Sequence, residues 1–470
     1  MKKEMHENIN KTSAGSMLPV ILALAWPTML EQLLQTAVQY IDTAMVGSLG
    51  TQATAAVGAT STVNWLIGST ISALGVGFLS FISQSIGAGE KQRAKRASGQ
   101  AVLTVLVVGV FFTLLTTSLS SRVPVWMQVD PDIHDMAARY FFILYVPMLF
   151  RSASIIFGTV LRAAGDTKTP MRVGLAVNLI NIALNFLLIY PTRTARLWNT
   201  TLTIPGAGLG VEGAAAASAI AYTFGGIAIT FMLWKHELIS PRGQRLRPDT
   251  AVLKPCLRVA FPNMLQRFAT SLGYVAFASM INSLGETATA AHTIANTVES
   301  AFYIPGYGMQ TAAATLAGNA LGAKNPQKLH RLARTILPLE VCLMIVSGGL
   351  LFLLAPQLMH LFSRDPEVIS LGAAVLRMVA VSEPFYGVPI VIEGMMLGMG
   401  KTVTPFVFNV LGMWCVRIVG TYLCTQLLGY GLIAAWGCMI GHNFLLFVLF
   451  SAHYIHVRRK GDILFEASRS

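Results

Sequence analysis

Long apolar stretches alternate with short polar ones along the whole chain. A helix rises 1.5 Å per residue, so about twenty consecutive apolar residues are enough to cross a bilayer. The pattern therefore predicts an all-α polytopic membrane protein with 12 transmembrane helices. The expected spans cover roughly 17–47, 54–86, 97–119, 136–160, 171–190, 212–234, 252–282, 288–318, 333–355, 369–395, 404–427 and 430–456.

Composition supports this prediction and excludes soluble enzymes. Of the 470 residues, 54% are hydrophobic and 12% are charged, whereas soluble domains contain about 25% charged residues. The sequence contains no H-E-x-x-H, G-x-S-x-G or P-loop motif. An intramembrane enzyme is therefore only a remote alternative, and no cofactor is expected.

The net charge of +13 is distributed asymmetrically. With the N-terminus placed inside, most of the 34 Lys and Arg residues fall in the inner loops and tails, including the runs 90–96, 242–247 and 456–460. This is the positive-inside pattern, so we expect a multi-pass protein of the plasma or inner membrane with both termini cytoplasmic. The basic runs are interpreted as topology signals that favour anionic lipid, and nucleic acid is not an expected partner.

An internal repeat organises the chain. Shifting the sequence by 235 residues superimposes Pro27 on Pro262, Asp130 on Asp365, and the motif at 165–170 on that at 400–405. Each repeat holds six spans, so the halves are expected to be related by an axis along the membrane normal. The predicted organisation is two pseudo-symmetric six-helix lobes: a cytoplasmic tail (1–16), an N-lobe (17–234), a cytoplasmic linker (235–251), a C-lobe (252–456) and a second cytoplasmic tail (457–470).

The first span carries two carboxylates at membrane depth, Glu31 and Asp42. Eleven residues turn a helix through three revolutions and about 20°, so both point the same way. Gln35 and Gln39 lie on the same face. A carboxylate in a bilayer is costly and usually marks a substrate or ion path. We predict that Glu31, Gln35 and Gln39 line a substrate cavity; for Glu31 the alternative is a structural hydrogen bond or a side chain that reaches the inner interface.

Asparagines recur at i, i+3 and i+7 in the fifth span, at Asn178, Asn181 and Asn185. This spacing places them on one helix face. They could orient Asp42 or supply oxygen ligands to a hard cation, which gives a possible Na⁺ site at Asp42 and Asn181. The alternative is that they join neighbouring helices by amide hydrogen bonds.

The second half has acids of its own. Glu299 and Glu383 are candidates for coupling, because an acid without a basic partner can load a proton near neutral pH. Glu393 is expected to anchor a loop, and Glu340 to form a structural pair or face the inner surface. Arg267 and Arg417 also lie at membrane depth and could neutralise an acid. Those two arginines leave the identity of the reactive acid open.

Several segments together resemble the multidrug and toxic compound extrusion (MATE) family across essentially the whole chain. They are WPTMLEQLLQTAVQYIDTAMVGSLG (26–50), SQSIGAGEKQRAKR (83–96), LRAAGDTKTP (161–170), TLAGNALGAKN (315–325) and SEPFYGVPIVIEGMMLGMGKTVTP (382–405). The resemblance implies an antiporter with two six-helix lobes that expels bulky, often cationic amphiphiles in exchange for H⁺ or Na⁺. It matches Asp42 to a functional aspartate and Asn181 to its polar partner.

The chain departs from the family pattern at several positions. Some members have an aspartate where this chain has Asn185, and others have a glutamate where it has Thr270. In the second copy of the LRAAGDT motif, Leu397 and Lys401 replace arginine and aspartate. Coupling is therefore expected at Asp42 with the three asparagines, or at Glu299 with Glu383.

The predicted function is secondary active efflux by alternating access, carried out by a monomer in the lipid bilayer. The alternative within transport is a flippase of the same superfamily for lipid-linked precursors. Such a flippase would need a basic, hydrated cavity, and the acid-bearing spans argue against it.

Overall fold

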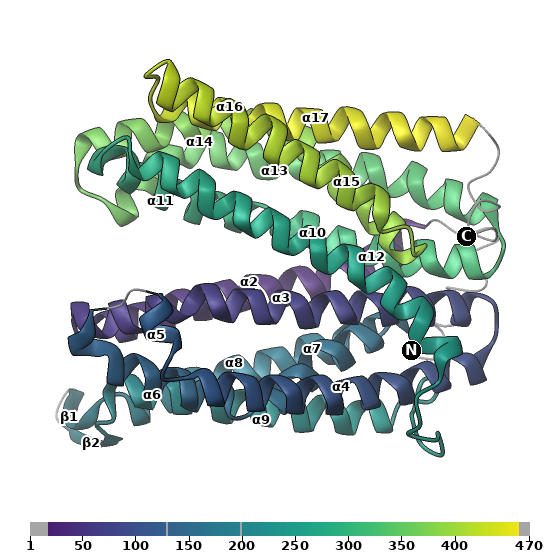
Figure 1. The fold of residues 1–470 in the computed structure, drawn as a ribbon, viewed down its shortest axis with the longest axis horizontal. Helices are drawn as coiled ribbons and strands as arrows, with labels where there is room; N and C mark the ends of the chain where they lie inside the picture. Colours follow the sequence, from purple (N-terminus) through teal and green to yellow (C-terminus); the bar gives the residue numbers. More distant parts are fainter. Residues whose placement is uncertain (1–16, 128–129, 198–199, 460–470) are drawn as a thin grey trace. The chain divides into compact units, whose positions relative to one another are not determined.

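The computed structural model describes residues 17–127, 130–197 and 200–459, and helices dominate it (Figure 1). The helices sort into two compact units. The first contains Leu30–Phe78 and Lys91–Lys254, and the second contains Pro255–Ser470 with Leu79–Glu90 and Met1–Met29, in each case as far as these are described. We call them the N-unit and the C-unit. The boundaries of the lobes and tails remain predictions.

Two long helices of the first repeat contribute to both units, α2 (Leu18–Gly47) and α3 (Thr51–Gly87). The other elements of the N-unit are α4 (Lys91–Leu119), α5 (Val123–Trp126), η1 (Pro131–Ile133), α6 (His134–Tyr145), α7 (Met148–Ala163), α8 (Lys168–Leu188), β1 (Pro191–Leu197), β2 (Thr200–Ala207) and α9 (Gly210–Trp234).

The C-unit holds the second repeat. Its elements are α10 (Thr250–Asn282), α11 (Glu286–Phe302), α12 (Ile304–Gly322), α13 (Pro326–Phe362), α14 (Pro366–Gly398), α15 (Val403–Leu411), η2 (Gly412–Ile418), α16 (Val419–Tyr422), η3 (Leu423–Leu427) and α17 (Leu432–Arg459). The first residues of α10 belong to the N-unit.

Three of the expected spans are irregular helices. The span at 136–160 consists of α6 and α7, which meet at a 50° bend where Pro147 has no N–H to donate. The span at 288–318 breaks at Tyr303, just before Pro305 at the start of α12. The span at 404–427 contains two π-helical segments, η2 and η3, a local widening often found at functional sites.

Nine helices of the described part are long and apolar enough to cross a membrane, or ten if α6 and α7 form one span. The multi-pass character is therefore evident, while the number twelve remains a prediction. Helix α10 carries Lys254, Arg258 and Arg267, which lower its hydropathy. Helix α11 has only 17 residues, because the break at Tyr303 separates it from α12.

Small residues allow the helices of the C-unit to approach closely. A Cβ atom placed on Gly398 of α14 would lie 1.9 Å from the backbone oxygen of Ala314 in α12. The start of α2 packs against the same region through Ile21 and Leu24, which are almost completely buried with Leu316. This contact fixes the N-terminal part of α2 as a component of the C-unit core.

The long loop between α8 and α9 forms an antiparallel hairpin of β1 and β2, which the hydrophobic pattern did not predict. Arg193 at its base lies over the ring of Tyr190, 4.5 Å from its centroid. The hairpin follows directly on the C-terminal end of α8 (Figure 1). It is an addition to an otherwise helical fold.

Candidate ion and substrate site

The N-unit holds a carboxylate surrounded by amides. Asp42 on α2 is half-buried, and its Oδ1 accepts a 2.6 Å hydrogen bond from Nδ2 of Asn185 on α8. The same nitrogen lies 3.2 Å from Oδ1 of Asn181, whose own Nδ2 donates to Oγ of Ser218 on α9. With the Asn181 amide turned over, its nitrogen would donate to Asp42 Oδ2 and Oδ1 at 3.1 and 2.9 Å. Three helices therefore meet at one negative charge.

One acceptor in this cluster has no partner. Oδ1 of Asn185 is buried and accepts no hydrogen bond from any described residue. No lysine or arginine of the described chain forms an ion pair with Asp42. Buried acceptors in proteins normally have a hydrogen-bond partner. An unpaired oxygen beside a carboxylate therefore indicates a place that can accept a proton-bearing group or a positive ion. The donor set suits either a proton on Asp42 or a small hard cation bound by the carboxylate and amide oxygens.

The structure brings two of the three predicted asparagines to Asp42. Asn181 and Asn185 are buried, 6% and 1% exposed. Asn178 lies on the same helix but is only half-buried and makes no side-chain hydrogen bond to the described residues. Asn181 and Asn185, which lie four residues apart on α8, form the cluster because Ser218 of α9 and Asp42 of α2 lie next to them. A role for Asn178 remains a prediction.

Glu31 is neutralised by an arginine. Both of its carboxylate oxygens accept from Nη2 of Arg162 on α7, at 2.8 and 2.6 Å. Both side chains are about one-fifth exposed, 20% for Glu31 and 19% for Arg162. This pairing resembles the structural alternative considered for Glu31, and a place for Glu31 in a substrate cavity remains a prediction. The neighbouring Gln35 and Gln39 have exposed side chains, and their role in a substrate cavity remains a prediction.

The LRAAGDTKTP motif supplies that arginine and also starts a helix. Its Asp166 accepts from the backbone N–H of Thr169 at 3.1 Å and from the Thr169 hydroxyl at 2.7 Å. These bonds satisfy donors in the first turn of α8. The motif thus orients the helix that carries Asn181 and Asn185.

The C-unit contains three buried acids, two of which lie in the electrostatic range of the third, Glu383. Glu299 on α11 accepts a hydrogen bond from the Tyr303 hydroxyl. Glu383 on α14 and Glu340 on α13 are fully buried, and their oxygens have no hydrogen-bond partner in the described chain. The charges of Glu299 and Glu340 both act on Glu383. An ionised carboxylate in such surroundings is costly, so these acids are suited to binding protons.

Two expectations for this unit are wrong. Glu340 neither pairs with a described residue nor faces the surface, because α12 and α14 enclose it. Glu393 does not anchor a loop: it accepts from Nε2 of Gln266 on α10 at 2.8 Å and from Nδ2 of Asn409 on α15 at 3.4 Å. It therefore joins three helices.

The arginines at membrane depth have different surroundings. Arg417, in η2, lies over the rings of Tyr274 and Phe277 at 4.8 and 4.3 Å from their centroids. Its contacts are cation–π interactions with α10. Arg267 lies in the electrostatic range of Glu393. Neither Glu299 nor Glu383 forms an ion pair with these arginines, although Arg417 lies in the electrostatic range of Glu299.

Sequence reasoning missed a third such arginine, Arg151 on α7. Its Nη1 donates to Oδ1 of Asn64 at 2.5 Å, and the same oxygen accepts from the Tyr145 hydroxyl at 3.1 Å. Its guanidinium also lies 4.9 Å from the centroid of the Tyr222 ring. The available signal was an arginine inside the span expected at 136–160. Asn64 corresponds to Glu299 under the 235-residue shift, so the repeats place different chemistry at equivalent positions.

The fold and these clusters define a helical membrane protein with two repeats and polar clusters at membrane depth. A model of the MatE family matches residues 27–187 and 262–423. The two matches begin at the prolines that the internal repeat superimposes, Pro27 and Pro262. The chain belongs to the MatE family, a family of transporters, and is therefore a transporter and not an enzyme. The resemblance found in its motifs is confirmed.

Curated relatives agree over nearly the full length. The probable multidrug resistance protein NorM of Thermotoga maritima is 27% identical over 420 residues, covering 89% of this chain and 88% of that protein. The probable multidrug resistance protein YpnP of Bacillus subtilis is 25% identical over 435 residues, covering 92% and 93%.

Solved structures share the fold. A MATE crystallised in complex with MaL6 matches with a TM-score of 0.87 at 22% identity, covering 95% of this chain and 97% of that one. A MOP superfamily transporter from Pyrococcus furiosus, described by a reverse polarity of its binding pocket that suggests a different function, matches with a TM-score of 0.86 at 22% identity, covering 94% and 96%.

Proposed function

We propose that the protein is a secondary active antiporter that exports bulky, often cationic amphiphiles in exchange for H⁺ or Na⁺. The proposal rests mainly on the Asp42 cluster. The Asp42 carboxylate accepts a hydrogen bond from Asn185 and has no basic partner among the described residues, and Oδ1 of Asn185 beside it accepts no hydrogen bond from them. Relatives described as probable multidrug resistance proteins support the substrate class.

Competition for one negative charge would couple the two fluxes. When Asp42 takes up a proton or Na⁺, its attraction for a cationic substrate falls, and the substrate is released outward. When the ion leaves inward, the charge is again available to the next substrate. A ligand that binds both conformations equally shifts nothing, so coupling requires this difference in affinity.

The acids of the C-unit form a second coupling position within the same proposal. Glu299 is held by Tyr303, while Glu383 and Glu340 have no partner in the described chain. Protonation would remove the cost of burying these charges. If the acids of the C-unit bind the coupling protons, Asp42 would bind mainly the substrate or Na⁺.

The arrangement in the membrane is part of the proposal. We place the protein in the plasma or inner membrane as a monomer with both termini cytoplasmic, and the two six-helix lobes on either side of the 235–251 linker. The asymmetric distribution of Lys and Arg supports this orientation.

Proteoliposomes test the function directly. Transport of a fluorescent lipophilic cation would be measured under an imposed pH gradient and, separately, under an imposed Na⁺ gradient. Wild type should respond to at least one gradient, and Asp42→Asn should lose most of the response. If neither gradient drives transport by wild type, antiport is wrong. If Asp42→Asn is normal while Glu299→Gln fails, the coupling position lies in the C-unit.

One observation favours the alternative, a flippase for anionic lipid-linked precursors. Arg151 supplies a positive charge at membrane depth. It donates a hydrogen bond to the Asn64 amide oxygen, lies over two tyrosine rings, and forms no ion pair with an acid of the described chain. The two functions differ in the charge they recognise. Competition of an anionic lipid phosphate with the cationic dye, abolished by Arg151→Gln, would favour the flippase.

A further inference from the structure

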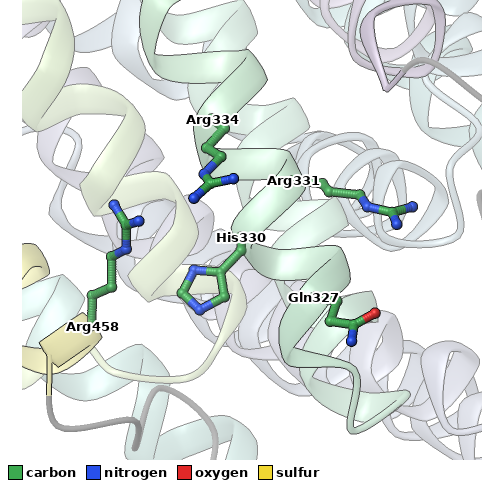
Figure 2. Close-up of a pocket in the computed structure, with 5 residues that line it drawn as sticks. All are labelled: Gln327, His330, Arg331, Arg334 and Arg458. Carbon is green, nitrogen blue, oxygen red and sulfur yellow. The ribbon is translucent and has the colours of Figure 1, made fainter.

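A basic pocket lies in the C-unit where α13 begins and α17 ends. Its volume is about 370 Å³, and it is lined by Gln327, His330, Arg331, Arg334 and Arg458. Figure 2 shows His330 and Arg334 on one side of α13, with the Arg458 side chain reaching toward them from the end of α17. None of the five lining residues is an acid.

Helix geometry explains how four of these residues gather. Positions 327, 330, 331 and 334 follow the i, i+3, i+4, i+7 spacing of one helix face. The opposite face of the same turns is locked into the core through Leu329 and Leu332, which are 1% and 0% exposed. The arginines are therefore projected from a rigid helix.

The positive charges act on common neighbours. Both Arg334 and Arg458 interact electrostatically with His330, and both also interact with Tyr454. Like charges that line one pocket repel each other, and a bound anion would relieve that repulsion. Guanidinium groups match phosphate oxygens through paired N–H donors.

We propose that this pocket binds a phosphate-bearing anion, either the headgroup of an acidic phospholipid or a soluble phosphate ester. Basic pockets between helix ends on the cytoplasmic side of membrane proteins bind anionic headgroups, and the positive-inside pattern assigns this end to that side. One turn before Arg458 on α17, the apolar side chain of Ile455 is 47% exposed. Acyl chains could lie there while the phosphate occupies the pocket.

Binding by the purified full-length protein in detergent tests the site without any transport measurement, so it is independent of the proposed function. Native mass spectrometry would titrate phosphatidylglycerol against phosphatidylcholine. The pocket variant is Arg334→Gln with Arg458→Gln. The control is Arg242→Gln with Arg245→Gln, which removes the same charge from exposed positions before α10. Phosphatidylglycerol should bind the pocket variant about tenfold more weakly, with a change below about threefold in the control.

The source of the phosphate is resolved by a competitor. Glycerol 3-phosphate that displaces phosphatidylglycerol at millimolar concentration would assign the site to soluble phosphate esters, and failure to displace it would assign the site to lipid. Unchanged thermal unfolding of the variant shows that it is folded; if it is not, Arg334→Lys alone replaces it and should weaken binding less than Arg334→Gln. Equal weakening in both charge variants, or equal binding of the two lipids, would overturn the proposal.

Discussion

Gly87 and Gly322 occupy equivalent positions in the two repeats, and each lies against the backbone of the helix that carries the other. A Cβ on Gly87 would lie 2.0 Å from the backbone oxygen of Asn319, and a Cβ on Gly322 would lie 1.9 Å from that of Gln84. Gln84 and Asn319 are themselves equivalent under the 235-residue shift. The crossing of α3 and α12 is therefore a point of local two-fold symmetry.

Gly87→Ala and Gly322→Ala should destabilise the protein by similar amounts. Each added methyl group would clash with backbone and force the helices apart, at a cost of about 1–3 kcal/mol. Thermal unfolding in detergent measures the loss. Gly349→Ala is the matched control, because nothing lies within 4 Å of its Cβ position. A control as unstable as the two variants would contradict the explanation.

Asp42→Asn should reduce ion-coupled efflux at least about tenfold with little change in unfolding temperature. The amide keeps the shape of the side chain but lacks the negative charge for which ion and substrate compete. Efflux from proteoliposomes measures the effect. Asp135→Asn removes a carboxylate that is 80% exposed and should leave efflux unchanged. Equal losses in both variants would remove the special role of Asp42.

Arg162→Met should destabilise the protein by about 2 kcal/mol, because it leaves the Glu31 carboxylate largely buried without its donor. Glu31→Gln in the same chain should recover part of the loss, since the uncompensated charge is then gone. Unfolding midpoints of the two single variants and the double variant form the thermodynamic cycle. Strictly additive effects would show that the two side chains are not energetically coupled.

Glu340→Gln should raise the unfolding temperature, more at pH 8 than at pH 6. The wild-type carboxyl group is completely buried without a partner in the described chain, and its ionised form, favoured at higher pH, is costlier to bury than an amide. Unfolding at the two pH values tests this. Glu367→Gln, at an exposed position in the first turn of α14, should show no such difference. A loss of stability at both pH values would indicate that Glu340 has a stabilising ligand.

The periodic features of this chain could be predicted from its sequence. The two family matches begin 235 residues apart, as the internal repeat predicted. The helical spacing in the fifth span placed Asn181 and Asn185 on one face, and this is the face that meets Asp42. Local period is enough for such predictions, because it determines which side chains of one helix point together.

Contacts between distant segments could not be predicted in this way. The partner of Glu31 is Arg162, 131 residues away, and spacing within one helix contains no information about it. The enclosure of Glu340 likewise results from the packing of α12 and α14 against α13. The sequence shows a proline at position 147, but membrane helices tolerate proline, so the residue alone did not predict the bend.

Helix α2 runs without interruption from the C-unit core, at Ile21 and Leu24, to the N-unit carboxylate Asp42. This helix is therefore one of the continuous connections between the two units, as α3 and α10 are. Pro27 lies two residues before the change of unit and removes one backbone hydrogen bond there. A missing hydrogen bond lets a helix bend, so Pro27 marks the turn at which the segment that carries Asp42 can change direction relative to the buried start of α2.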